Sequence, residues 1–134
     1  MPAYNKRVEM LAEALMTYSG YNDPNGPLYQ ARNPIGLRAT SMRHVKNEQG
    51  HRVFNSFIDG IQAALFDIST KLSGKSWAEL TPENTLADLA VAYSQPTTAA
   101  DAWARYLRKA FNDATVTKKT PLSYFMTDIT KDTN

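Results

Sequence analysis

Apolar residues recur with a helical period near the start of the chain. From Val8 to Leu15 they stand three or four positions apart, which places them along one face of an α-helix. The pattern predicts a helix from about Lys6 to Tyr18, and Gly20 is suited to end it. Ser19 continues the apolar row by one turn, so we expect its side chain to point inward at the helix end, whereas Glu13 should face water.

A longer apolar stripe follows in the middle of the chain. Its members stand at helical spacing and are Phe54, Phe57, Ile58, Ile61, Leu65, Ile68 and Leu72. Ser56, with Asp59 three positions on, resembles a capping box, so this segment is predicted to be the central core helix. Gly60 in its first turns costs about 1 kcal/mol relative to Ala. We therefore expect a compensation at Gly60, namely the close approach of another backbone segment.

The second half of the chain contains three further helix starts. Each combines a Ser or Thr with an acidic residue three positions later, and they are Ser76–Glu79, Thr85–Asp88 and Thr98–Asp101. They predict a short helical turn, a helix that reaches Tyr93, and a last long helix that reaches Phe111. A short turn over Pro121–Met126 closes the fold, and a polar tail begins at about residue 127.

The segment between the first and the central helix lacks a helical period. Asn47–Gly50 is typical of a tight turn, and the residues on either side of it, within Gly36–Val53, are predicted to form the short polar strands of a small β-hairpin. The predicted fold class is therefore mainly α (α+β). It is one helical domain over residues 1–134, with a small β-hairpin region after the first helix.

Composition narrows the classes of function. The 134 residues include no cysteine, which excludes disulfides, thiol nucleophiles and cysteine-ligated metals. The net charge of +2 is not gathered in a basic block, so nucleic acid is not expected as a partner. No apolar run approaches the roughly 18 residues of a membrane-spanning helix, and the first residues do not resemble a signal peptide. His44 and His51 have no further ligands at metal-binding spacing, so neither a metal nor another cofactor is expected.

Acidic residues are the remaining candidates for catalysis, because the sequence contains neither a nucleophile elbow nor a glycine-rich phosphate loop. A glycosidase needs a carboxylic acid held in a cleft and partly removed from water. Glu13 is expected to face water, and Asp88 and Asp101 are explained as helix caps. Asp23, in the Gly/Pro/Asn-rich loop after the first helix, is the one weak catalytic candidate, and its alternative role is an Asx-turn.

Four sequence pieces occur in a recognisable order. They are Ser19-Gly20-Tyr21 at the end of the first helix, the turn Asn33-Pro34-Ile35-Gly36-Leu37-Arg38, the aromatic segment Val53–Phe57 leading into Gly60-Ile61, and the helix Thr85–Tyr93 followed by Pro96, a further helix and Thr120-Pro121-Leu122. In these pieces the chain resembles the lysozyme-superfamily, lytic-transglycosylase-like domains of phage virion proteins and of some bacterial cell-wall proteins. The resemblance spans nearly the whole chain.

The resemblance implies a groove between the first helix and the hairpin region, with the central helix as its floor and the Thr85–Tyr93 helix on its far side. Its ligand would be peptidoglycan or a related glycan. The residues that the resemblance places along the groove are Ser19, Tyr21, Arg32, Asn33, Arg38 and Tyr93. In active relatives the first helix ends in a glutamate that acts as the acid, and the matching position here is Ser19. A serine hydroxyl does not protonate a glycosidic oxygen at neutral pH.

Three functions remain open at this point. The first is a peptidoglycan-binding, lysozyme-like domain in which catalysis is lost or strongly reduced, that is, a pseudoenzyme. The second is an active muramidase or lytic transglycosylase that uses a non-standard acid such as Asp23. The third is a non-enzymatic structural or interaction protein, a virion component or accessory factor with a protein partner, that keeps only the fold. The resemblance further implies a location in a virion, or in the periplasm or exterior of a bacterial cell.

Overall fold

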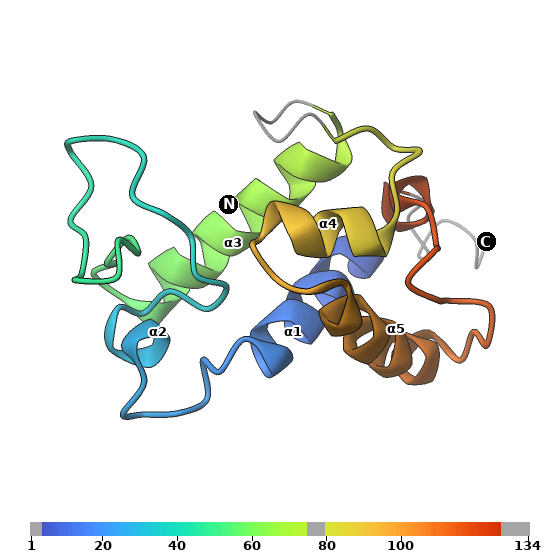
Figure 1. Cartoon of the computed structure of the whole chain (residues 1–134), viewed down its shortest axis with the longest axis horizontal. Helices are drawn as coiled ribbons and strands as arrows, with labels where there is room; N and C mark the ends of the chain where they lie inside the picture. Colours follow the sequence, from blue (N-terminus) through green and yellow to red (C-terminus); the bar gives the residue numbers. More distant parts are fainter. Residues whose placement is uncertain (1–3, 75–79, 127–134) are drawn as a thin grey trace.

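The structure, a computed structural model, describes residues 4–74 and 80–126 and is mainly helical. Its elements are α1 (Lys6–Tyr18), α2 (Pro27–Gln30), α3 (Phe57–Leu72), α4 (Leu86–Ala92), α5 (Thr97–Phe111) and the 3₁₀ helix η1 (Leu122–Met126). The predicted helical turn at Ser76–Glu79 and the predicted polar tail lie outside the described residues. None of the helices in the described part of the chain is long and apolar enough to cross a lipid bilayer. In Figure 1, α2 and the irregular segment after it lie at one end of the molecule, and α5 and η1 lie toward the other.

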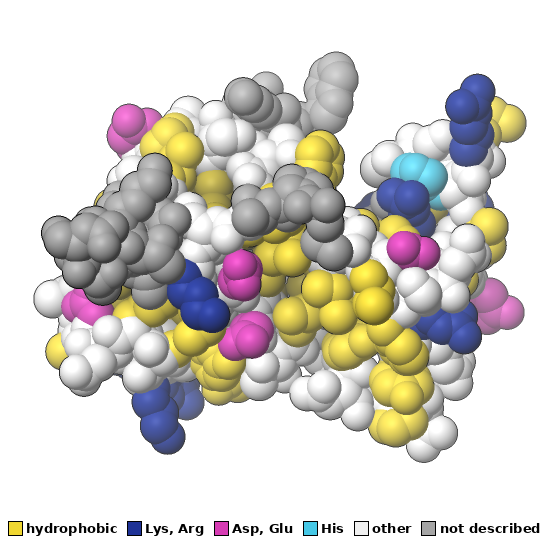
Figure 2. All heavy atoms as spheres, turned by 180° about the vertical axis from the view of Figure 1, so that it is seen from behind, with side chains coloured by type: hydrophobic (Ala, Val, Ile, Leu, Met, Phe, Trp, Pro, Cys, Tyr) yellow, Lys and Arg dark blue, Asp and Glu magenta, His cyan; other side chains and the backbone are white. Residues whose placement is uncertain are grey.

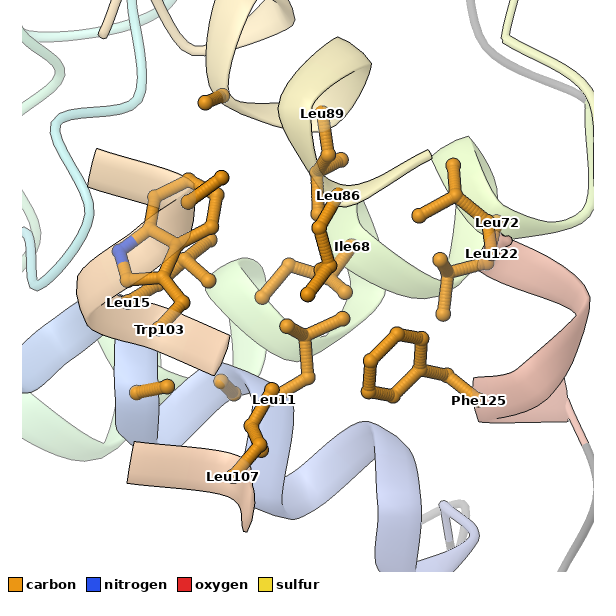
Figure 3. Packing of buried hydrophobic residues seen from close by; sticks show 14 of the residues in the cluster. Leu11, Leu15, Ile68, Leu72, Leu86, Leu89, Trp103, Leu107, Leu122 and Phe125 are labelled. Atoms are coloured by element: carbon orange, nitrogen blue, oxygen red, sulfur yellow. The ribbon is translucent and has the colours of Figure 1, made fainter. Parts of the chain in front are cut away.

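The hydrophobic core lies where α1, α3, α4, α5 and η1 meet (Figure 3). Its large buried side chains, two from each of these elements, are Leu11, Leu15, Ile68, Leu72, Leu86, Leu89, Trp103, Leu107, Leu122 and Phe125. Burying a side chain of this size contributes about 1.5–3 kcal/mol relative to leaving it in water. The core therefore holds α1, α3, α4, α5 and η1 together.

The first helix, α1, has the predicted bounds. Asn5 caps its start, because the Asn5 side-chain oxygen accepts a hydrogen bond of 2.9 Å from the Val8 amide. At the other end Gly20 has φ = +86°, the left-handed conformation that stops a helix. Both helix ends are therefore set by local sequence, and Ser19 becomes the C-cap residue.

The central helix, α3, differs in part from its prediction. It begins at Phe57 and is capped by the Ser56 hydroxyl, so Phe54 is buried ahead of the helix and not on it. Ile58, predicted in the apolar stripe, is 64% exposed. The buried face carries Ile68 and Leu72, as predicted, together with Gly60 and Ala64.

Gly60 explains this difference. A Cβ atom at Gly60 would overlap the Arg32 carbonyl oxygen and would lie 3.1 Å from Pro34 Cδ. The predicted close approach of another backbone segment is thus confirmed. Because the chain at Arg32 packs directly on Gly60, this position faces the protein interior, and Ile58 is turned toward solvent.

The predicted β-hairpin is reduced to its turn. The Gly50 amide donates a hydrogen bond of 3.1 Å to the Asn47 carbonyl oxygen, which closes the turn. The flanking residues form no strand within the described chain. They form only isolated antiparallel bridges, at Arg38 with His51 and at Lys46 with Arg52. The strand prediction is therefore wrong in extent, because a short polar segment offers little cross-strand side-chain packing.

The buried side chain of Asn33 makes hydrogen bonds where a ladder of backbone hydrogen bonds between two strands was expected. Its amide nitrogen donates to the carbonyl oxygens of Leu37 (2.8 Å) and Arg52 (2.9 Å), and its oxygen accepts from the Leu37 amide (2.9 Å). Asn33 has no exposed surface, so these bonds satisfy a polar group that would otherwise destabilise the fold. Asn33 thereby joins the two sides of the Gly36–Val53 segment.

The starts of the last two helices differ in how they are capped. Thr85 and Asp88 form the predicted capping box at α4, in which the Asp88 carboxylate accepts from the Thr85 amide at 2.9 Å. The predicted cap of the last helix is wrong. α5 starts after Pro96 without a side-chain cap, and the Asp101 carboxylate lies 3.9 Å from the Lys118 ammonium group.

Candidate binding cleft

A cavity of about 670 Å³ lies between four segments of the chain. They are the end of α1, the stretch from residue 27 to 52 (α2 and the irregular segment after it), one face of α3, and the end of α4 with the loop after it. These segments can be followed in Figure 1, where the irregular segment lies to the left of α3 and α4 to its right. We call this cavity the cleft. Its size falls within the roughly 300–1,000 Å³ of ordinary ligand sites.

Ser19 forms the α1 side of the cleft. Its hydroxyl donates a hydrogen bond of 2.6 Å to the Pro34 carbonyl oxygen, with the Met16 carbonyl oxygen at 3.0 Å as an alternative acceptor. The same hydroxyl accepts a hydrogen bond of 3.2 Å from the Tyr21 amide. The half-buried Ser19 side chain is thus engaged within the protein on both its donor and its acceptor side.

Tyr93, the C-cap residue of α4, shares two hollows with Ser19. Both residues line the cleft, and both line a narrow hollow of about 20 Å³ between α1, α4 and α5. The C-terminal ends of α1 and α4 therefore meet beside the cleft.

Asp67 and Lys71 lie on the floor of the cleft, one turn apart on α3. The Tyr93 hydroxyl donates a hydrogen bond of 2.6 Å to Asp67 Oδ2, and Lys71 Nζ lies 2.5 Å from the same oxygen. Lys71 Nζ also lies 4.6 Å from the centroid of the Tyr93 ring, a cation–π distance. The three side chains form one hydrogen-bonded cluster.

The environment of this cluster keeps the Tyr93 hydroxyl protonated. Burial is the main cause that raises the pKa of Tyr93 well above its ordinary value, and the Asp67 charge and hydrogen bond add to it. Exposure differs within the ion pair, since the Lys71 side chain is 12% exposed and that of Asp67 31%. Asp67 is therefore the member of the ion pair that is more open to a ligand.

Arg38, His51 and Arg52 form the basic side of the cleft. Arg38 Nη1 donates a hydrogen bond of 2.6 Å to the Gln49 carbonyl oxygen, which holds this side chain in place. Burial, and then the Arg38 charge, lower the pKa of His51, so its ring is neutral near pH 7. His51 Nδ1 is buried and has no hydrogen-bond partner among the described residues.

The predicted glycan-binding residues fall into two groups. Ser19, Arg38 and Tyr93 line the cleft, so the fold brings these three together. Asn33 does not line it, because its side chain is fully buried and is used to join the irregular segment.

The other two predicted residues, Tyr21 and Arg32, belong to an aromatic cluster outside the cleft. The Tyr21 ring lies 6.0 Å from the Phe57 ring and 6.1 Å from the Tyr29 ring, and the Arg32 guanidinium lies 5.8 Å from the Phe57 ring. Figure 2, which shows the molecule from behind, shows apolar side chains gathered on the half that contains α2 and the start of α3. This cluster fastens the loop between α1 and α2 onto α3.

Asp23, the catalytic candidate, is exposed in the loop after α1 and does not line the cleft. Its Oδ1 accepts a hydrogen bond of 3.0 Å from the Asn25 amide. This is the Asx-turn named as its alternative role. Glu13 is likewise exposed, and its carboxylate accepts a hydrogen bond of 3.1 Å from the Tyr106 hydroxyl.

Asp67, Lys71 and His51 were not predicted as cleft residues. An acidic and a basic residue four positions apart within an apolar helix indicate a pair that shares one face, and this spacing was the available signal for Asp67 and Lys71. The position of His51 had no such signal, because it depends on how the irregular segment folds back onto α3.

The described residues were also considered as a metal site, and the whole chain was compared with known proteins. Within 4–74 and 80–126, no group of three or more His, Asp or Glu side chains is placed to hold a metal ion. Comparisons of the chain with models of protein families, with curated proteins and with solved structures found no match.

Proposed function

We propose that this protein binds glycan strands of peptidoglycan in the cleft and does not cleave them. The observation that carries the proposal is the convergence of Ser19, Tyr93 and Asp67 on one 670 Å³ cavity. The proposal also draws on the resemblance to lysozyme-like domains, whose groove runs between the first helix and the segment after it. A location in a virion or at the bacterial cell wall follows from the same proposal.

The chemistry of the cleft suits a sugar polymer. Sugar hydroxyls act both as donors and as acceptors, and the cleft offers both kinds of group. Arg38 and Arg52 donate, and the second oxygen of the Asp67 carboxylate is available to accept. A cavity lined by fixed polar groups orients such a ligand without a cofactor.

We expect no cleavage because no side chain in the cleft is placed to donate the proton that cleavage needs. Glycosidic cleavage needs a carboxylic acid that donates a proton to the leaving oxygen. Ser19 has no such proton to give, and Asp67 Oδ2 accepts from two donors, Tyr93 and Lys71. Asp23 is outside the cleft. The cleft therefore holds the ligand but lacks the group that would protonate it.

Co-sedimentation with insoluble, purified peptidoglycan tests the binding. Wild-type protein is expected in the pellet, and Arg38→Ala is expected to shift toward the supernatant. Arg105→Ala is the matched control, since Arg105 is exposed on α5 and does not line the cleft. Wild-type protein that remains in the supernatant would refute peptidoglycan binding, and equal loss with both variants would refute the location of the site.

Release of soluble muropeptides tests the lack of cleavage. Wild-type protein is expected to release none, whereas Ser19→Glu, which places a carboxylic acid at the helix end, is expected to release them. Ser19→Gln has the same size without the acid and is the control. Release by the wild type would contradict the proposal, and its loss in Asp23→Asn would then assign the acid to Asp23. A folded but inactive Ser19→Glu would show that Ser19 does not occupy the acid position.

A further inference from the structure

A second hollow of about 550 Å³ adjoins the cleft. The two cavities share the side chains of His44, Arg52, Ala63 and Phe66, so they follow one another along the same side of α3. Phe66 is 66% exposed and stands at the boundary between them. Because they share these lining residues, the two cavities form one groove along α3, a shape that suits a polymeric ligand.

The charges along this groove are unequal. On the cleft side the Lys71 charge is matched by Asp67, at 2.5 Å. The remaining charged side chains of the two cavities are three arginines and one acid: Arg38, Arg43, Arg52 and Asp59. Within the part of the chain that the structure describes, no carboxylate lies within the 4.0 Å ion-pair distance of any of these arginines. The groove therefore carries an excess of positive charge on its loop side.

Arg52 is held in place at the boundary of the two cavities. Its backbone amide donates a hydrogen bond of 2.9 Å to the Leu37 carbonyl oxygen, and its carbonyl oxygen accepts one of 2.9 Å from the side-chain Nδ2 of Asn33. Its guanidinium lies 4.6 Å from the ring of Phe54, which is buried. A guanidinium stacked on a ring keeps its in-plane N–H groups available, and these match the two oxygens of a carboxylate.

We infer that the groove selects a glycan whose branches carry carboxylates, and that Arg52 and Arg43 bind a branch carboxylate in the second hollow while the cleft holds the sugar chain. This inference rests on the proposed binding of peptidoglycan and adds which part of that ligand, the carboxylates of the branches, the second hollow recognises. A neutral sugar polymer would leave the arginines without a partner. A carboxylate-bearing peptide branch supplies the matching charge next to the sugar chain.

Calorimetric titration with two soluble ligands tests the inference. One is a neutral N-acetylglucosamine oligomer, and the other is a peptidoglycan fragment of equal chain length that retains its peptide branches. The wild-type protein is expected to bind the branched fragment at least about tenfold more tightly at low salt, a preference that shrinks as salt screens the charges. Arg43→Gln is expected to lower this ratio of affinities by about fivefold.

Two controls make the outcome decisive. Arg105→Gln on α5 makes the same chemical change away from both cavities and should leave the ratio unchanged. Arg52→Lys keeps the positive charge but removes the in-plane N–H groups that match the two oxygens of a carboxylate. This variant should therefore also lower the ratio. Equal affinities for the two ligands, or a ratio that Arg43→Gln leaves unchanged, would overturn the inference while the proposed glycan binding stands. Failure of both ligands to bind would overturn the two together.

Discussion

The Ser19 hydroxyl donates a hydrogen bond of 2.6 Å to the Pro34 carbonyl oxygen and so ties the end of α1 to the turn after α2. The same hydroxyl accepts from the Tyr21 amide at 3.2 Å. Pro34 in turn lies against Gly60 of α3. The residue at the end of α1 therefore has a structural role, which joins one wall of the cleft to its floor.

Replacing Ser19 by Ala removes this tie. The Pro34 carbonyl oxygen would lose its donor while Pro34 stays buried, so the free energy of unfolding should fall by about 1–2 kcal/mol in urea denaturation. Ser123→Ala makes the same chemical change at an exposed position whose hydroxyl has no hydrogen bond among the described residues, and should change stability by less than about 0.5 kcal/mol. Equal effects of the two variants would show that the Ser19 bond contributes nothing.

The two members of the ion pair on α3 should respond unequally to mutation. Asp67→Asn leaves the Lys71 ammonium, on a side chain only 12% exposed, without its counter-charge. Lys71→Met leaves Asp67, 31% exposed and hydrogen-bonded to Tyr93, in partial contact with water. We expect a loss of about 2–3 kcal/mol for Asp67→Asn and a smaller one for Lys71→Met, measured by urea denaturation. The reverse order would contradict the burial of Lys71.

Gly60 should tolerate no side chain. The Cβ of Gly60→Ala would overlap the Arg32 carbonyl oxygen, and backbone moves aside less easily than a side chain. The helix-propensity gain of about 1 kcal/mol should therefore be outweighed, with a net loss of about 2 kcal/mol or more in thermal or urea unfolding. Gln62→Ala, two positions on in α3 and half-buried, is the control. A stabilised Gly60→Ala variant would show that α3 and the Arg32 segment are not in contact.

Alkaline pH should destabilise the fold, and Tyr124 should account for part of this effect. Burial and the hydrogen bond to Asp113 (2.9 Å) raise the pKa of Tyr124 from 10.0 to about 12, against the opposing effect of the Arg7 charge. Below pH 10 both the folded and the unfolded states keep the proton. Between pH 10 and 12 only the unfolded state loses it, so stability falls over this window. Two pH units correspond to about 2.7 kcal/mol, and solvent screening of a half-buried group reduces this to about 1 kcal/mol.

Tyr124→Phe tests this origin. The variant should show a shallower decline of unfolding free energy between pH 10 and 12 than the wild type. Tyr29→Phe removes a hydroxyl that has no hydrogen bond among the described residues, and should leave the decline as it is. A decline of equal steepness in Tyr124→Phe and in the wild type would assign it to other groups.

The helices were predictable where local sequence sets them. The bounds of α1 follow from its apolar row and from Gly20, and the start of α4 from the Thr85–Asp88 box, because both signals act within a few residues. The contact at Gly60 was predictable in kind, since an uncompensated glycine costs stability, although its partner Arg32 was not.

The cleft was less predictable because it depends on contacts between distant residues. The irregular segment is held by Asn33 rather than by a strand ladder, and the bond from Asn33 to Arg52 spans 19 positions. That fold-back places His51 and Arg52 beside α3, and no local pattern reports it. The Asp67–Tyr93 hydrogen bond joins residues 26 positions apart, and a hydrophobic periodicity does not predict such a contact.

Amide chemical-shift mapping with a soluble peptidoglycan fragment tests glycan binding in the cleft most directly. Titration should shift the amide signals of Gly36, Arg38, Lys71 and Tyr93, which line the cleft from three different segments. The signals of Lys118 and Lys119, which lie beside α5, should stay in place. Unchanged spectra at saturating fragment, or shifts confined to residues outside the cleft, would contradict the proposed function.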